Sequence, residues 1–215
     1  MIGNSMPGRV ITPRKHRRLA ASERRQSLIE AALDCLSRLG PDGAGVREIC
    51  DRAGVSPGLL RHYFDGKNEL IVEAYRALTR EYHGSLNRVL TGPAESAEQR
   101  LRSFFDAYFS SQLPGEGRAG TYAAFWTLGR TDPTIRRIQR SAHRRLQKLL
   151  APALSELAED RGAQIDAEQV ASSLIALLDG YWLDMCIDPE RFSRAKTGAI
   201  CWEWLETFIR GSRAR

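Results

Sequence analysis

The sequence predicts an all-α protein with a small N-terminal helical head and a larger C-terminal helical domain. Apolar residues recur at intervals of three and four along most of the chain, which is the periodicity of amphipathic helices. No segment alternates apolar and polar residues over the length of a strand. Asp132-Pro133 and Asp188-Pro189 each place a capping carboxylate before a first-turn proline. These observations together predict helices and no sheet.

The head is expected to begin with a helix over residues 22–39. Its apolar positions fall on one side, which we expect to be buried; they are Leu28, Ile29, Ala32, Leu36 and Leu39. A second helix starts at Val46 and ends at Gly54, which suits a left-handed cap. The chain must therefore turn at Gly54.

A third helix starts directly after this turn. Ser56 suits the N-cap and Pro57 the first turn, where no amide hydrogen is needed. Gly58, Arg61 and His62 share the side of this helix opposite its apolar residues. Two helices around a tight turn, the second with a polar outer face, are the arrangement of a helix-turn-helix that reads DNA.

The motif Ala53-Gly54-Val55-Ser56-x-Gly58, followed by His62-Tyr63-Phe64-x-x-Lys67-x-x-Leu70, resembles the signature of TetR-family transcriptional regulators. The resemblance implies a three-helix DNA-binding head over residues 22–66. The residues we expect nearest to double-stranded DNA are Arg47, Ser56, Pro57, Gly58, Arg61, His62, Tyr63 and Lys67.

Two positions depart from the family pattern. Arg61 stands where the family often has an aromatic residue, and Ala44-Gly45 replaces the Ser or Thr that often precedes the second helix. Arg61 could read a guanine edge, which contributes roughly 1–3 kcal/mol of base discrimination. A phosphate contact or a solvated side chain is the alternative for Arg61.

The net charge of the chain is concentrated before the head. The 215 residues carry a formal charge of +6; residues 1–25 hold seven basic residues and one acidic residue, and the charges of the remainder cancel. We predict that residues 1–21 form a flexible basic arm that contacts DNA. The alternative is a solvated tail that only aids solubility.

Residues 67–215 are expected to form a helical effector-binding and dimerisation domain. The expected helices cover residues 67–90, 96–112, 120–129, 133–160, 167–187 and 189–210. The last two carry apolar stripes, with Trp202, Leu205 and Ile209 on the final helix, that either close a monomeric core or form an interface. Reading a palindrome needs two heads about 34–36 Å apart, so we expect a homodimer. The resemblance implies that these two helices form its interface.

Aromatic residues gather in the middle of this domain. They form either ordinary core or, as the family resemblance implies, an effector pocket. The candidate pocket residues are Phe105, Asp106, Tyr108, Phe109, Tyr122, Phe125, Trp126 and Trp182. Segments 123–126 and 176–183 resemble the choline-responsive, BetI-like members of the family. An aromatic cage with a carboxylate, for which Asp106 is the candidate, suits a quaternary ammonium through cation–π attraction.

The helix from Pro133 carries a basic run. The run comprises Arg136, Arg137, Arg140, Arg144, Arg145 and Lys148. We interpret it as a solvated helix face, with a second nucleic-acid surface as the alternative.

The composition, the cysteines and the absence of catalytic motifs limit which other classes of protein this chain is expected to belong to. It is 42% hydrophobic and 27% charged, and no apolar run approaches the roughly 20 residues of a membrane span. Four widely spaced cysteines indicate buried thiols in the cytoplasm, without a metal or other cofactor. No nucleophile elbow, phosphate loop or zinc-protease motif is present, so an enzyme is not expected.

We therefore expect a repressor that a small-molecule effector, not identified by the sequence, releases from a palindromic operator. The helix from Lys67 is the expected lever between the two domains. A helical adaptor, or an uncharacterised enzyme, without sequence-specific DNA binding is the alternative.

Overall fold

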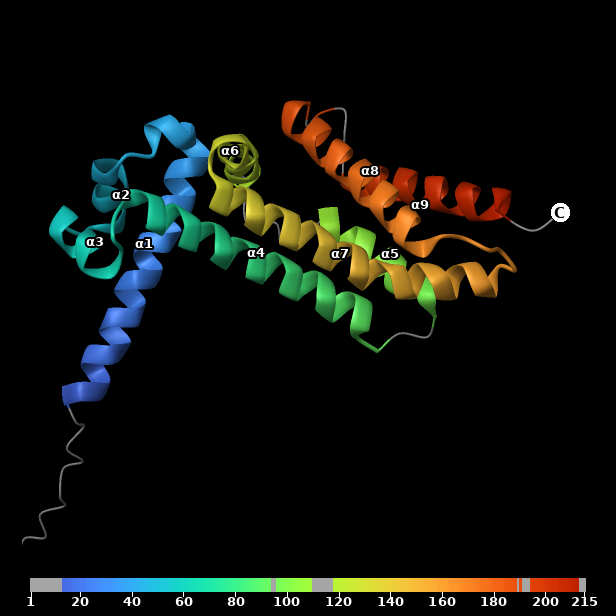
Figure 1. Ribbon diagram of the computed structural model, residues 1–215, viewed down its shortest axis with the longest axis horizontal. Helices are drawn as coiled ribbons and strands as arrows, with labels where there is room; N and C mark the ends of the chain where they lie inside the picture. Colours follow the sequence, from blue (N-terminus) through green and yellow to red (C-terminus); the bar gives the residue numbers. More distant parts are fainter. Residues whose placement is uncertain (1–12, 94–95, 110–117, 189, 191–193, 213–215) are drawn as a thin grey trace, which may run out of the picture.

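The computed structural model is all-helical and elongated, with the head at one end (Figure 1). It describes residues 13–93, 96–109, 118–188, 190 and 194–212, and no extended β-strand occurs in these ranges. The head contains α1 (Pro13–Gly43), α2 (Val46–Ala53) and α3 (Pro57–Tyr63). The remaining helices are α4 (Lys67–Thr91), α5 (Ala97–Phe109), α6 (Arg118–Thr131), α7 (Pro133–Asp160), α8 (Ala167–Ile187) and α9 (Arg194–Gly211). The predicted fold class is confirmed.

The first helix is longer at its N-terminus than the sequence suggested. It begins at Pro13, so residues 13–21 of the expected flexible arm are helical, while residues 1–12 lie outside the described residues. Gly40, at φ 69°, breaks the helix close to its expected end. Leu39, expected to be buried, is 52% exposed because it directly precedes this break, beyond the turn that packs on the core.

The helix-turn-helix has the expected local structure. Gly54 adopts the left-handed conformation, at φ 65° and ψ 35°, and ends α2. The Val55 N–H returns to the carbonyl of Cys50 at 3.0 Å, which closes the end of the helix. Ile49 and Leu60 are buried against the apolar side of α1 and hold both helices on one core.

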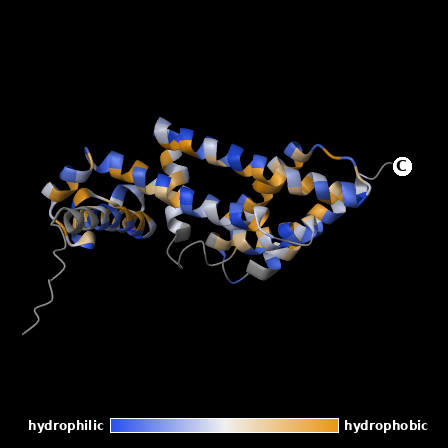
Figure 2. Ribbon diagram, turned by 90° about the horizontal axis from the view of Figure 1, so that it is seen from below, coloured by the Kyte–Doolittle hydropathy of each residue, from blue (hydrophilic) through white to orange (hydrophobic). Residues whose placement is uncertain are grey.

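A second core joins α4, α5, α7, α8 and α9, and apolar residues gather where these helices meet (Figure 2). Asp132 caps α7 as expected, accepting the Thr134 and Ile135 N–H groups at 2.7 and 3.0 Å. The bounds of α7 and α8 agree with the predicted ranges. The expected Asp188-Pro189 cap lies partly outside the described residues.

The helix α6 packs closely on α1, although it belongs by sequence to the second domain (Figure 1). The Thr121 hydroxyl is buried and donates to the Leu33 carbonyl of α1 at 3.1 Å. One residue earlier, a Cβ at Gly120 would overlap the Ser37 carbonyl oxygen. Phe125 stacks on Tyr75 of α4 with ring centroids 4.1 Å apart. The head core therefore continues across the expected boundary at residue 67.

The apolar stripe of α9 divides between two sides. Trp202, Leu205 and Ile209 are buried in the protomer's own core, which is one of the two interpretations that the sequence allowed. The outer side of α9 presents Trp204 and Phe208, whose rings stack 5.7 Å apart. Phe208 is 41% exposed.

None of the described helices combines the length and apolar character that crossing a membrane requires. The described thiols of Cys35, Cys50 and Cys201 are buried and unpaired, as expected.

The packing of α6 on α1 predicts the effect of Gly120→Ala. The added Cβ must displace the Ser37 backbone, so we expect the free energy of unfolding to fall by about 1–3 kcal/mol in a urea titration. Gly84→Ala in α4 is the control, because its nearest neighbour is the flexible end of Arg88 at 3.7 Å. Equal stability of the two variants would contradict this packing.

Candidate DNA-binding face and effector cavity

Two local features stabilise the N-terminus of the short, surface-exposed helix α3. The Ser56 hydroxyl accepts the Leu59 N–H at 3.3 Å, and Pro57 occupies the first turn, as predicted. Leu60 is buried and fixes the inner side of α3. Gly58, Arg61 and His62 are exposed on the other side. The sequence therefore predicted correctly which side chains α3 presents to solvent.

The other candidate DNA-contacting residues differ in their exposure and in the contacts that their side chains make. Arg47 is exposed on α2, with Asp51 at 3.9 Å. Tyr63 is half-buried against the head core and meets the His62 ring edge-on at 5.1 Å. The Lys67 ammonium donates to the Pro41 carbonyl at 3.2 Å and so ties the start of α4 to the segment after α1. Lys67 thus has a structural contact in addition to its expected role.

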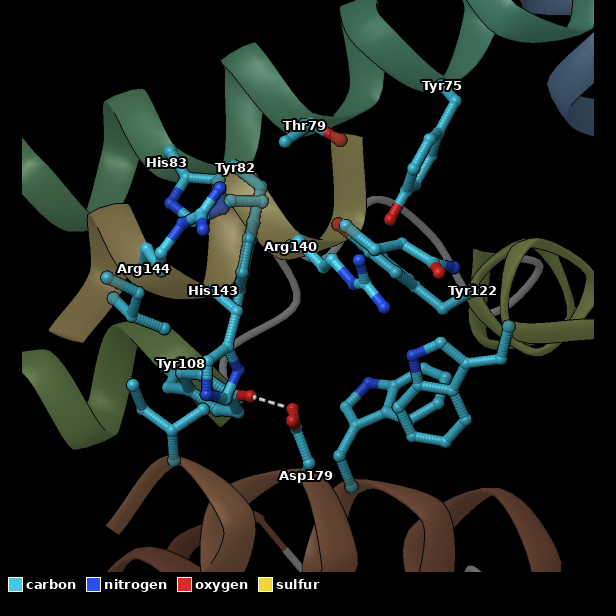
Figure 3. Close-up of a pocket in the computed structure, with 16 residues that line it drawn as sticks. Tyr75, Thr79, Tyr82, His83, Tyr108, Tyr122, Arg140, His143, Arg144 and Asp179 are labelled. Atoms are coloured by element: carbon cyan, nitrogen blue, oxygen red, sulfur yellow. Dashed lines mark hydrogen bonds between the residues drawn. The ribbon is translucent and has the colours of Figure 1, made fainter. Parts of the chain in front are cut away.

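A cavity of about 440 Å³ lies in the second domain (Figure 3). Residues from α4, α5, α6, α7 and α8 line it. The lining comprises Tyr75, Thr79, Tyr82, His83, Tyr108, Tyr122, Trp126, Gln139, Arg140, Ala142, His143, Arg144, Leu146, Ile175, Asp179 and Trp182. This volume falls within the range of about 300–1,000 Å³ that is usual for small-ligand sites.

Four of the eight candidate pocket residues line this cavity: Tyr108, Tyr122, Trp126 and Trp182. Phe105 and Phe109 instead belong to the surrounding core, and Phe125 belongs to the head core.

The expected carboxylate, Asp106, is exposed outside the cavity. A helix turns by about 100° per residue, so Asp106 points away from the side that Phe105 and Tyr108 share. The carboxylate in the cavity is Asp179 of α8, one turn before Trp182. That spacing of three residues was present in the sequence and could have identified Asp179.

Aromatic rings form a connected wall on one side of the cavity. The Trp182 ring meets Tyr122 at 5.5 Å and Trp126 at 5.4 Å, both edge-to-face. Tyr82 continues the wall, with its ring 5.9 Å from Tyr122 and 5.8 Å from Tyr108. Ring faces and an adjacent carboxylate are the groups that bind an organic cation.

A hydrogen bond from Tyr108 holds the Asp179 carboxylate in the cavity. The Tyr108 hydroxyl donates to Asp179 Oδ1 at 2.6 Å (Figure 3). Burial raises the pKa of Asp179, and this hydrogen bond opposes the shift because it stabilises the ionised carboxylate. Burial also raises the pKa of Tyr108 well above its ordinary value, so the phenol stays neutral.

Helix α4 adds residues that the sequence did not single out. Tyr75, Thr79, Tyr82 and His83 all line the cavity at intervals of three and four residues. This periodicity was visible, but nothing in it distinguished a cavity wall from an ordinary core. Burial, with Arg145 nearby, lowers the pKa of His83 to about 4, so the imidazole is neutral at pH 7.

Comparison with known families identifies both halves of the chain. Residues 28–74 match the family described as bacterial regulatory proteins, tetR family. Residues 97–210 match the BetI-type transcriptional repressor C-terminal domain. The chain belongs to the TetR family. It is a DNA-binding transcriptional regulator with a BetI-type C-terminal domain, and this family consists of regulators and not of enzymes.

The relatives match over most of their length. The HTH-type transcriptional regulator BetI of Vibrio vulnificus is 33% identical over 85% of this chain and 91% of that protein. BetI of Escherichia coli O17:K52:H18 is 35% identical over 75% of this chain and 82% of that protein.

Solved structures have the same fold. A transcriptional regulator from Pseudomonas aeruginosa PAO1 superimposes with a TM-score of 0.81, at 39% identity over 91% of this chain and 94% of that chain. A regulator from Saccharomonospora viridis, solved in complex with choline, gives a TM-score of 0.75 at 22% identity. The match covers 86% of this chain and 96% of that chain.

The Ser56 cap allows stability and DNA contact to be separated. Ser56→Ala should lower the free energy of unfolding by about 1 kcal/mol because the Leu59 N–H loses its acceptor. Ser56→Asp should keep the cap and the stability but weaken operator binding, since it adds a negative charge near phosphates.

The matched control for this prediction is Ser96→Asp, because the Ser96 hydroxyl caps α5 by accepting the Gln99 N–H at 3.2 Å. Thermal melts and DNA titrations of all three variants measure both effects. Unchanged operator affinity in Ser56→Asp would exclude the N-terminus of α3 from the DNA interface.

Proposed function

We propose that this chain is a dimeric repressor that a small quaternary ammonium compound of the choline type releases from a palindromic operator. The observation that carries the proposal is the aromatic cavity with Asp179, part of whose wall is formed by α6, the helix that packs on the head. The BetI-type C-terminal domain and the choline-bound relative support the same ligand class.

The cavity walls match the needs of a trimethylammonium group. Such a group carries its charge on an apolar surface, so it gains from ring faces more than from hydrogen bonds. Trp126, Trp182 and Tyr122 provide the rings, and the partly buried Asp179 provides the carboxylate. Its Tyr108 partner holds the carboxylate in place.

Helix α6 contacts both the cavity and the head. Tyr122 and Trp126 line the cavity, while Gly120 and Thr121 on the same helix contact α1. A ligand that moves α6 therefore moves a helix that has little room against the head. The ligand must bind the DNA-released state more tightly than the DNA-bound state, since only this difference shifts the equilibrium. We therefore add α6 to α4 as a lever between the domains.

The dimer interface is proposed on the outer sides of α8 and α9. Leu183 and Phe208 are 38% and 41% exposed, and Ile187 is 72% exposed. Large apolar side chains exposed on two adjacent helices indicate a surface that a partner covers. A second copy seated there would place two heads on one palindrome, as operator reading requires.

The DNA-binding part is tested by selecting bound sequences from a random DNA pool. We expect an inverted repeat whose half-sites lie about one helical turn apart, because two α3 helices read successive major grooves. Arg61→Ala should weaken binding to the selected site more than binding to random DNA if Arg61 reads a base. Recovery of no preferred sequence would favour the adaptor alternative.

The effector part is tested by titrating choline while following tryptophan fluorescence. Asp179→Asn should weaken choline binding by about tenfold or more, because it removes the counter-charge. Asp106→Asn is the matched control on the exposed side of α5 and should leave affinity unchanged. Choline should also release the operator in the same concentration range. Tight choline binding with unchanged operator affinity would disprove the proposed coupling.

A further inference from the structure

The helix α7 gives the cavity a cationic wall that a simple quaternary ammonium does not explain. Arg140 and Arg144 line it one helical turn apart, with His143 between them. Among the described lining residues, Asp179 is the single acidic residue. With both guanidiniums charged, the cavity already carries one more positive than negative charge, and a monovalent cation would add to this excess.

The two arginines have no protein partner in the described part of the chain. The ion pairs and hydrogen bonds found there do not involve Arg140 or Arg144. Arg136, one turn earlier on α7, differs because its Nε donates to the Gly129 carbonyl at 2.9 Å. The donors of Arg140 and Arg144 thus remain available to a ligand.

A buried imidazole adds a third available group. His83 is 8% exposed, and its Nδ1 has no hydrogen-bond partner among the described residues. A neutral imidazole offers one N–H donor, and leaving a buried polar group unsatisfied is unfavourable. A ligand oxygen that accepts from His83 would satisfy it.

These groups lie apart from the Tyr122, Trp126 and Trp182 part of the aromatic wall, while Tyr82, at the other end of the wall, meets the His83 ring at 5.7 Å. Figure 3 shows Tyr122 on one side of the cavity and His83 with Arg144 on the other, while Arg140 extends between them. We propose that the effector is a zwitterion, with an ammonium group on the aromatic wall beside Asp179 and a carboxylate or phosphate bound by Arg140 and Arg144. The inference rests on the proposed effector function and narrows its ligand class.

The chemistry of the two walls is complementary to such a ligand. Guanidinium groups form paired, charge-assisted hydrogen bonds with carboxylate and phosphate oxygens. Trimethylglycine is neutral overall and leaves the net charge of the cavity unchanged, whereas phosphocholine carries about one net negative charge and offsets the positive excess. In both compounds each charged group meets an opposite charge. The basic run of α7 is exposed at Arg137, Arg140 and Arg144, as the solvated-face interpretation expects, but of these three only Arg140 and Arg144 also line the cavity.

The test compares three compounds that share a trimethylammonium group. Choline has a hydroxyl, trimethylglycine a carboxylate and phosphocholine a phosphate. Dissociation constants are measured by calorimetry on the full chain at low salt. We expect at least one zwitterion to bind about tenfold or more tightly than choline, the difference that a charge-assisted interaction supplies. The preferred compound distinguishes carboxylate from phosphate.

Variants assign the effect to the cationic wall. The double substitution Arg140→Gln and Arg144→Gln should bring the affinity for the preferred zwitterion down to that for choline. The matched control, Arg137→Gln with Lys148→Gln, removes an equal charge from the same helix outside the cavity and should preserve the preference. Thermal melting of each variant verifies folding.

Two results would overturn the inference. One result is that choline binds most tightly and that the double variant binds both zwitterions with the affinity of the unmodified chain. The proposal of a zwitterionic effector is then wrong, while the proposal of a choline-type effector is kept. If none of the three compounds binds, both the zwitterion and the quaternary ammonium are wrong. Recovery of an inverted repeat in the DNA selection would then still support the regulator.

Discussion

The contact of Gly120 and Thr121 with α1 ties the effector cavity to the DNA-binding head. The absence of a side chain at Gly120 lets α6 approach the Ser37 carbonyl, and the Thr121 hydroxyl satisfies the Leu33 carbonyl at the same place. Because α6 also supplies Tyr122 and Trp126 to the aromatic wall of the cavity, its position depends on both the cavity and the head. Close packing transmits displacement, since a dense interface deforms little before it rearranges. The proposed release of DNA depends on this constraint.

The cavity combines two environments that are usually kept apart. Its aromatic side is dry enough to raise the pKa of Asp179, while its α7 side carries two guanidiniums without partners in the described chain. Folding keeps a buried carboxylate only with hydrogen-bonding support, which Tyr108 gives. A carboxylate with a raised pKa that shares a cavity with two arginines is typical of a ligand site and not of a stabilising core.

Local patterns predicted the head well because its structure is dictated by neighbouring residues. A left-handed glycine, a capping serine and a first-turn proline are each determined within a few positions of the chain. The cavity was predicted less well, since the sequence placed its carboxylate at Asp106 and the fold placed it at Asp179. Aromatic clusters look alike in sequence whether they fill a core or line a space, so Phe105 and Tyr108 could not be told apart.

The sequence by itself determined the helical class, the helix-turn-helix, the polar outer side of α3 and the family. These follow from periodicity, capping and a short motif, which are properties of contiguous residues. Only the tertiary structure decided that α6 packs on α1, that Trp202 belongs to the protomer's own core, and that Arg140 and Arg144 join His83 and Asp179 around one cavity. Those groups lie on three helices, α4, α7 and α8, and their proximity depends on the packing of whole helices, which no local pattern encodes.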